Sequence, residues 1–239
     1  MKWAIQLLGD TSDLSALAKT LIGSDVNVTH DGKDYLMTSD RFDGPEDAAA
    51  IHASAKEIVA VLSGACRLAL DATQPLKVGA VHRCHPDGRR DVIVFPEPAA
   101  IRCRLISPTV KLTHNDGSVE EFNPADPVKH WMELALSCDA VAKVFHLLSA
   151  STLDWVNLYR ILEIVKADVG GWDAIADNGW AAEKSAELFT RTANSPDAAS
   201  LESRHGSSTK KPPRKPMLIS EARSLTSSIV HAWLRSKTG

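Results

Sequence analysis

The sequence predicts an α+β protein: an N-terminal antiparallel sheet with two helices, followed by an all-α helical half. Three Asp-Gly pairs separate alternating segments, at Asp31-Gly32, Asp87-Gly88 and Asp116-Gly117. Such pairs favour hairpins because tight turns need positive φ, which Gly adopts without steric cost. All three lie before Pro124, whereas helical periodicity dominates after it. The first half shows no repeating β-α-β pattern, so we expect its strands to be antiparallel, with the helices on one face.

The N-terminal elements follow from alternation and capping residues. Residues 2–8 read as a strand, and Thr11, Ser12 and Asp13 offer caps for a helix to about Leu21. Pro45 should open a long Ala-rich helix that ends near Leu70. The expected strands of the sheet are 26–30, 33–37, 76–84, 89–95, 101–105, 110–114 and 118–122.

After residue 125 the apolar spacing becomes helical, which places a domain boundary there: 1–125 and 126–239. Asp154 is a plausible N-cap, and Gly170-Gly171 should end the helix that it starts. A Ser-, Lys- and Pro-rich stretch, 207–216, reads as a basic linker before the last helix. The expected helices are 128–137, 139–148, 154–169, 172–190 and 220–236.

The last helix carries Leu225, Ile229 and Trp233 at helical spacing. We therefore expect it to dock on the helical body, with Trp233 as the main anchor and Ser220 as its cap. If it were free, its basic and amphipathic character would instead indicate a tail that binds a partner.

Composition and cysteine usage indicate a cytoplasmic globular protein. Hydrophobic residues make up 44% of the chain and charged residues 24%, which is ordinary for a chain with a core. The first nine residues are too short for a signal peptide, and we expect no membrane span. The four cysteines form no Cys-x-x-Cys pair, so we expect free thiols.

Charge is distributed unevenly. The chain has net charge −3, but the segment from Arg204 to Gly239 holds eight Lys or Arg residues and one acid. This basic end could bind the acidic body of its own chain or an external polyanion such as RNA. Residues 210–216 contain no aromatic residue for base stacking. A solvated loop and a contact with RNA phosphates both stay open for this segment.

The candidate catalytic residues are Arg191, Asn194, Arg204 and His205. Arginine could grip a phosphate or carboxylate, and histidine could transfer a proton. Helix capping explains the same stretch: Ser195 as N-cap, then Pro196, with Arg204 and His205 in the last turn before Gly206. These residues are therefore either a site or a capped structural helix.

No cofactor or metal site is predicted. His82, Cys84 and His85 are ligand types, but strand alternation places His85 on the face opposite the other two. His130 and Glu133 lack the second histidine of a His-Glu-x-x-His site. The chain also lacks a Gly-rich phosphate loop after a strand.

One helix carries a family resemblance. Leu153-Asp154-Trp155-Val156-Asn157-Leu158-Tyr159-Arg160-Ile161-Leu162-Glu163 follows a β-rich half, and the second half resembles the helical part of bacterial abortive-infection proteins of the ApeA type, which carry a HEPN domain. The resemblance implies a helical, commonly dimeric protein of antiviral defence. Many HEPN proteins are metal-independent ribonucleases with an Arg-x(4–6)-His motif.

The chain does not match that spacing. Arg204 and His205 are adjacent, and Arg223 precedes His231 by eight positions. Our leading hypothesis is therefore a helical interaction module without a recognisable catalytic site, self-associating as a homodimer in a bacterial stress or phage response. The alternative is a HEPN-like metal-independent ribonuclease, so whether the chain is an enzyme stays open.

Overall fold

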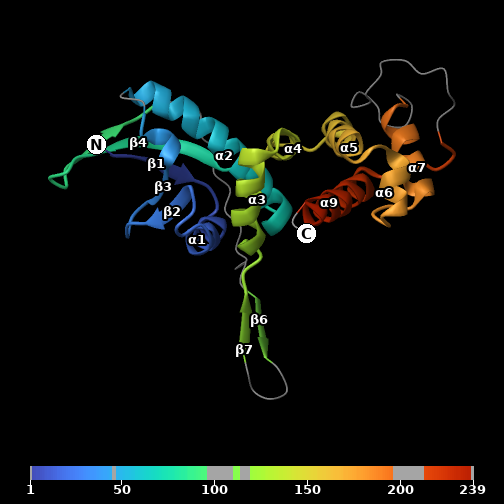
Figure 1. Ribbon diagram of the computed structural model, residues 1–239, viewed down its shortest axis with the longest axis horizontal. Coiled ribbons are helices and arrows are strands. Elements are labelled where there is room, and N and C mark those ends of the chain that lie inside the picture. The colour runs from blue at the N-terminus through green and yellow to red at the C-terminus, as the bar shows by residue number, and fades with distance from the viewer. Residues whose placement is uncertain (1, 45–46, 96–109, 114–118, 196–212, 238–239) are drawn as a thin grey trace. The chain divides into compact units, whose positions relative to one another are not determined.

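A computed structural model describes residues 2–44, 47–95, 110–113, 119–195 and 213–237 (Figure 1). The chain divides into two compact units, 1–137 and 138–239, here called unit 1 and unit 2. Unit 1 holds the strands and unit 2 is helical in the part that the structure describes. The predicted α+β class, with the sheet first and the helical half second, is confirmed.

Unit 1 is built on a five-stranded antiparallel sheet in the order β2-β3-β1-β4-β5. Each predicted hairpin joins neighbouring strands, because a short turn leaves its two strands side by side. Gly32 and Gly88 have φ of 94° and 86° at the first two turns, as the Asp-Gly signals require. The strands are β1 (Lys2–Leu8), β2 (Val26–His30), β3 (Tyr35–Ser39), β4 (Lys77–Cys84) and β5 (Arg90–Ile93).

The third predicted hairpin, β6 (Val110–Thr113) and β7 (Val119–Phe122), forms its own two-stranded antiparallel sheet. The pairing confirms that the third hairpin exists. Its turn, 114–118, and the expected strand 101–105 lie outside the described residues.

The pairing of β1 with β4 shifts register between Ile5 and Leu7. The Gln6 side chain lies over this bulge, and its Oε1 accepts from the Ala80 backbone N–H at 3.2 Å. A Cβ added to Gly79 would lie 3.1 Å from both the Cβ and the backbone carbonyl oxygen of Gln6, and 2.6 Å from Oε1 at the end of that flexible side chain, so glycine favours this close approach.

Three helices complete unit 1: α1 (Thr11–Thr20), α2 (Ala48–Leu70) and α3 (Asp126–Ser137). Helix α2 packs on β1 and β4, and the core that it covers includes Ile5, Leu62 and Val81, all with 0% exposure. A short 3-10 turn, η1 (Asp40–Phe42), precedes α2. Helix α2 begins at Ala48, three residues after the expected start at Pro45, and its cap is Asp47, whose carboxylate accepts from the Ala50 N–H.

Helix α3 belongs to unit 1, although the expected boundary near residue 125 assigned it to the helical half. It packs against α1 and α2 and buries Val128, Trp131 and Met132. The turn before it is also held in unit 1, since Asn123 Nδ2 donates to the Ala16 carbonyl at 3.2 Å. The division of the chain therefore falls between Ser137 and Cys138.

Helix α2 is long and apolar enough to cross a membrane by length and composition, which the sequence analysis did not anticipate. In unit 1, 56% of its apolar window is buried inside the protein. The core helix of a soluble domain meets the same criterion, so the helix alone decides nothing about a membrane.

Unit 2 is assembled around α5 (Trp155–Val169), on which α4 (Asp139–Leu148), α7 (Glu183–Ala193) and α9 (Ile219–Ser236) pack (Figure 1). The predicted N-cap of α5 is confirmed, because the Asn157 N–H donates to Asp154 Oδ1 at 2.7 Å. Gly170, with φ of 96°, ends the helix as expected.

The prediction of a single helix over 172–190 is wrong. The structure has α6 (Trp172–Asp177), a break, and then α7. Asn178 ends α6 and Gly179 follows with φ of 70°, a left-handed conformation that stops a helix. The break folds α6 back against α7.

The terminal helix α9 is docked, as predicted. Trp233 is fully buried, and its Nε1 donates to Asp168 Oδ2 of α5 at 2.8 Å. The expected cap is wrong, since α9 starts at Ile219 and the Glu221 carboxylate accepts from the Leu218 N–H at 2.7 Å. The helix therefore begins one residue before Ser220.

Candidate binding pocket on the helical unit

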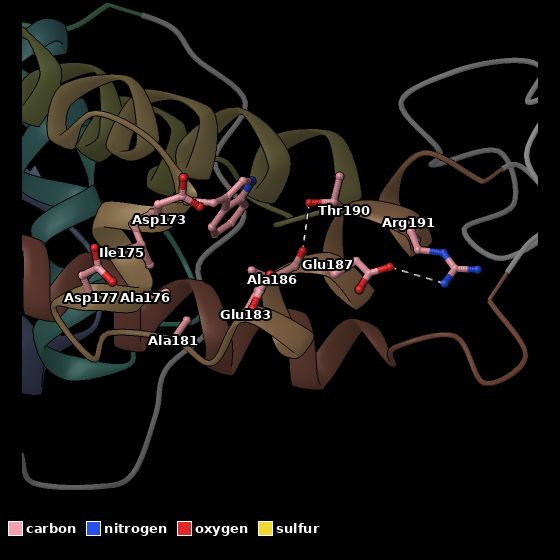
Figure 2. A pocket seen from close by; sticks show the side chains of 11 residues that line it. Asp173, Ile175, Ala176, Asp177, Ala181, Glu183, Ala186, Glu187, Thr190 and Arg191 are labelled. Atoms are coloured by element: carbon pink, nitrogen blue, oxygen red, sulfur yellow. Dashed lines mark hydrogen bonds and ion pairs between the residues drawn. The ribbon is translucent and has the colours of Figure 1, made fainter.

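Helices α6 and α7 line an open pocket of about 870 Å³ on unit 2 (Figure 2). Its size falls within the range of small-ligand and side-chain pockets, which is roughly 300–1,000 Å³. The walls come from the two helices and the loop between them, so the Asn178-Gly179 break creates the pocket.

The floor of the pocket is apolar and fixed. Ile175 and Ala186 line it with exposures of 1% and 6%. On the next turn of α7, Phe189 is fully buried, with ring centroids 5.7 Å from Trp155 and 6.2 Å from Tyr159 of α5. This aromatic packing holds α7, and with it one wall of the pocket, on the central helix.

The rim of the pocket is acidic. Asp173 and Asp177 lie on α6, and Glu183 and Glu187 lie on α7 (Figure 2). All four are exposed, and Arg191 is the only basic residue among the described lining residues. Its Nη1 lies 3.6 Å from Glu187 Oε1, one helical turn away. The pocket therefore has an excess of negative charge at its mouth.

The candidate catalytic residues are only partly described. Arg191 lies at the pocket with its side chain half exposed, paired with Glu187. Asn194 caps the end of α7, and its Oδ1 is buried without a hydrogen-bond partner among the residues that the structure describes. Arg204, His205 and the expected capped helix lie outside the described residues.

The end of α7 is tied to the start of α9 by a threonine. Thr192 Oγ1 donates to the Leu188 carbonyl at 2.8 Å and accepts from the Met217 N–H at 3.1 Å. Ser195, the expected N-cap, is buried at 3% exposure. The chain is therefore packed against its neighbours at Thr192 and Ser195, and it is hydrogen-bonded to the end of α7 again at Met217.

In the second Arg–His pair of the helical half, Arg223 and His231, the arginine has a structural role. Arg223 of α9 donates from Nε and Nη2 to the Leu153 carbonyl, at 3.0 and 2.8 Å. It fastens α9 to the loop before α5.

The His82, Cys84 and His85 cluster is spread over the sheet. His82 is buried at 5% exposure, and His85 Nε2 lies 2.7 Å from Asp91 Oδ2. Among the described residues, no three His, Cys, Asp or Glu side chains are arranged to hold a metal ion. Cys66, Cys84 and Cys138 are free thiols, and Cys103 lies outside the described residues.

Sequence reasoning missed the acidic residues of the pocket. Asp173 and Asp177, like Glu183 and Glu187, are four residues apart, which places each pair on one helix face. In one continuous helix these pairs would read as a solvated face. The sequence signal that could have revealed the pocket was Asn178-Gly179, which ends α6 and lets the two acidic pairs lie around one pocket.

Comparisons with protein families, with characterised proteins and with solved structures find no match to this chain.

Proposed function

We propose that unit 2 is an interaction module whose α6–α7 pocket binds a cationic segment of a partner protein. The observation that carries the proposal is the combination of a preformed apolar floor with four rim carboxylates and one arginine. A segment that presents an apolar side chain between lysines or arginines matches both features. The floor would take the apolar side chain and the rim would take the charges.

The expected affinity is modest. Exposed ion pairs contribute about 0.2–1 kcal/mol each, and they weaken as salt is added. A buried aliphatic side chain adds about 1.5–3 kcal/mol. Together with the cost of ordering the segment, these terms suggest dissociation constants on the order of 0.1–1 mM for a short peptide. Such an affinity suits a reversible contact rather than a permanent complex.

Fluorescence anisotropy tests the proposal with a labelled peptide that alternates lysine with leucine. We expect binding to the full chain that weakens as salt rises, and at least tenfold weaker binding to an Asp173→Asn/Asp177→Asn/Glu183→Gln variant. A control variant, Asp139→Asn/Glu163→Gln, removes two carboxylates of unit 2 that do not line the pocket. Equal affinity of the triple variant and the control would contradict the proposal.

The same pocket argues against RNA as its ligand. Four carboxylates around Arg191 repel the phosphates of a polyanion, so a ribonuclease site would have to lie elsewhere. Incubation of the full chain with total RNA and a chelator tests the alternative. Cleavage that is lost in His205→Ala, with the melting temperature unchanged, would favour the ribonuclease.

We also propose that the chain acts in the cytoplasm as a homodimer, in a bacterial stress or phage response. Exposed apolar side chains such as Leu136, at 46% exposure, offer surface for self-association. Light scattering at tens of micromolar checks this state directly, and a strict monomer would contradict it.

A further inference from the structure

His82 is a buried titratable group on the five-stranded sheet of unit 1. It lies on β4, paired with Ala4 on one side and Val92 on the other. Neither ring nitrogen has a hydrogen-bond partner among the residues that the structure describes, and the side chain is 5% exposed. Leaving a buried polar group unpaired costs about 1–3 kcal/mol, so this arrangement calls for an explanation.

The face of the sheet that carries His82 is bridged by polar side chains. Successive strand residues point to opposite faces, so His82 and Ala4 lie on the face opposite Ile5 and Val81. Across this outer face, Arg90 Nη1 of β5 donates to Asp31 Oδ2 of the β2–β3 turn at 2.7 Å. Strands β1 and β4 lie between β3 and β5 in the sheet, so this ion pair joins the β2–β3 turn to the edge strand on the far side.

A second bond holds the same turn. Gln6 Nε2 of β1 donates to Asp34 Oδ1 at 2.8 Å, while the other end of its amide accepts from the Ala80 N–H. The turn itself is ordered by Asp31 Oδ1, which accepts from the N–H groups of Lys33 and Asp34 at 3.1 and 2.8 Å. The β2–β3 turn is thus fastened to β1 and to β5.

The fastening groups are also the charges that surround His82. Burial lowers the pKa of His82, and Arg90 and Lys33 lower it further, while Asp34 and Asp31 act to raise it. On the neighbouring strand β1, Ala4 and Gln6 add no charge near His82. Lys2 is further along β1, where it lies opposite Cys84. A protonated His82 would add a cation beside Arg90 and compete for the two turn carboxylates.

We propose that the β2–β3 turn is an acid-released latch, closed by the Asp31–Arg90 and Asp34–Gln6 contacts at neutral pH and opened when His82 is protonated. A neutral imidazole is buried at the cost of its unpaired nitrogens, but an imidazolium needs water or a carboxylate. Opening the turn supplies both. Since protonation is disfavoured in the closed form, the latch is fully stable above the ordinary histidine pKa of about 6.5 and weakens as pH falls below it.

NMR of the full chain tests the latch. The reporters are the Gln6 side-chain amide, the Arg90 Nε–H and the Asp34 backbone amide, followed from pH 7.5 to 5 together with the His82 ring. We expect all to shift with one midpoint, and the opening equilibrium of the turn, from amide exchange corrected for intrinsic rates, to rise about tenfold at pH 5.5. His82→Gln should abolish the transition, whereas His30→Gln and His85→Gln should leave it.

A transition that persists in His82→Gln would overturn the proposal, as would reporters that stay fixed while the His82 ring titrates. Should His82→Gln fail to fold, Asp31→Asn replaces it as the decisive variant. It removes the ion pair while keeping an amide oxygen for the turn, so the turn amides should exchange faster already at pH 7.5. Unchanged amide exchange at pH 7.5 in Asp31→Asn would show that the Asp31–Arg90 ion pair does not keep the β2–β3 turn closed, and it would contradict the proposal.

Discussion

Gly79 shows how a single position fixes the sheet. At the bulge between β1 and β4, a methyl group on residue 79 would lie 3.1 Å from the Cβ and the backbone carbonyl oxygen of Gln6, which is tighter than ordinary contact. We expect Gly79→Ala to destabilise the protein by about 1–3 kcal/mol, because a crowded site forces side chains and backbone to shift. Urea unfolding measures this, and Gly44→Ala is the control, since nothing lies within 4 Å of a Cβ there. Equal losses in the two variants would contradict the bulge argument.

Trp233 is the residue on which the docking of α9 depends most. Its side chain is fully buried against α5, so Trp233→Ala leaves a large cavity and removes the Nε1–H donor to Asp168, whose carboxylate keeps its ion pair with Lys237. We expect a loss of about 3–5 kcal/mol in the free energy of unfolding. Leu218→Ala, at a side chain that is 64% exposed, serves as control and should cost under about 0.5 kcal/mol. A loss below 1 kcal/mol for Trp233→Ala would mean that α9 is not firmly docked.

Asp168 gives this docking a pH dependence. Partial burial acts to raise the pKa of its carboxyl, but the Lys237 ammonium at 2.8 Å and the Trp233 N–H outweigh burial and lower the pKa. A lowered carboxyl pKa stabilises the fold above the unfolded value, about 3.9, and this contribution is lost as pH falls through the folded value. The difference in melting temperature between wild type and Asp168→Asn should therefore shrink from pH 6 to pH 3. A constant difference would contradict the ion pair.

At the scale of elements, α3 decides where unit 1 ends. Because α3 buries Val128, Trp131 and Met132 against the α1–α2 side of the unit, its removal exposes a large apolar surface. We expect a fragment 1–137 to unfold cooperatively, and a fragment 1–125 to aggregate or bind a hydrophobic dye. Circular dichroism and urea melts compare the two. Equal cooperativity of both fragments would place the boundary near 125 after all.

The elements also show what the sequence could and could not predict. The Asp-Gly turns predicted the hairpins, because the chemistry that selects the turn is local. The sequence also predicted the apolar face of α3, but it did not predict which elements cover that face. A stripe of apolar residues indicates that one face of a helix is buried, and it does not identify the packing partner. The α6–α7 break was missed although Gly179 carried a local signal, because the periodicity on either side of it was continuous enough to suggest one helix.

At the scale of the whole molecule, the candidate site depends on tertiary structure that no spacing reveals. The sequence identified Arg191, which lies at the pocket. The acids that give the pocket its charge come from α6 and α7, and these two helices face each other only because the chain turns back between them. The four-residue spacing of Asp173 and Asp177 is as common on solvated helices as in sites. Only the packing of α6 and α7 on α5 brings these charges around an apolar floor.

Chemical-shift mapping of the labelled full chain with the lysine–leucine peptide tests the binding proposal most directly. We predict saturable shifts for the amides of Ile175, Ala186 and Glu187, which line the pocket, while amides of α9 such as Ile229 stay in place. Added salt should reverse the shifts, because screening weakens exposed ion pairs. Shifts confined to residues outside the α6–α7 pocket, or none at millimolar peptide, would contradict the claim that this pocket is a binding site.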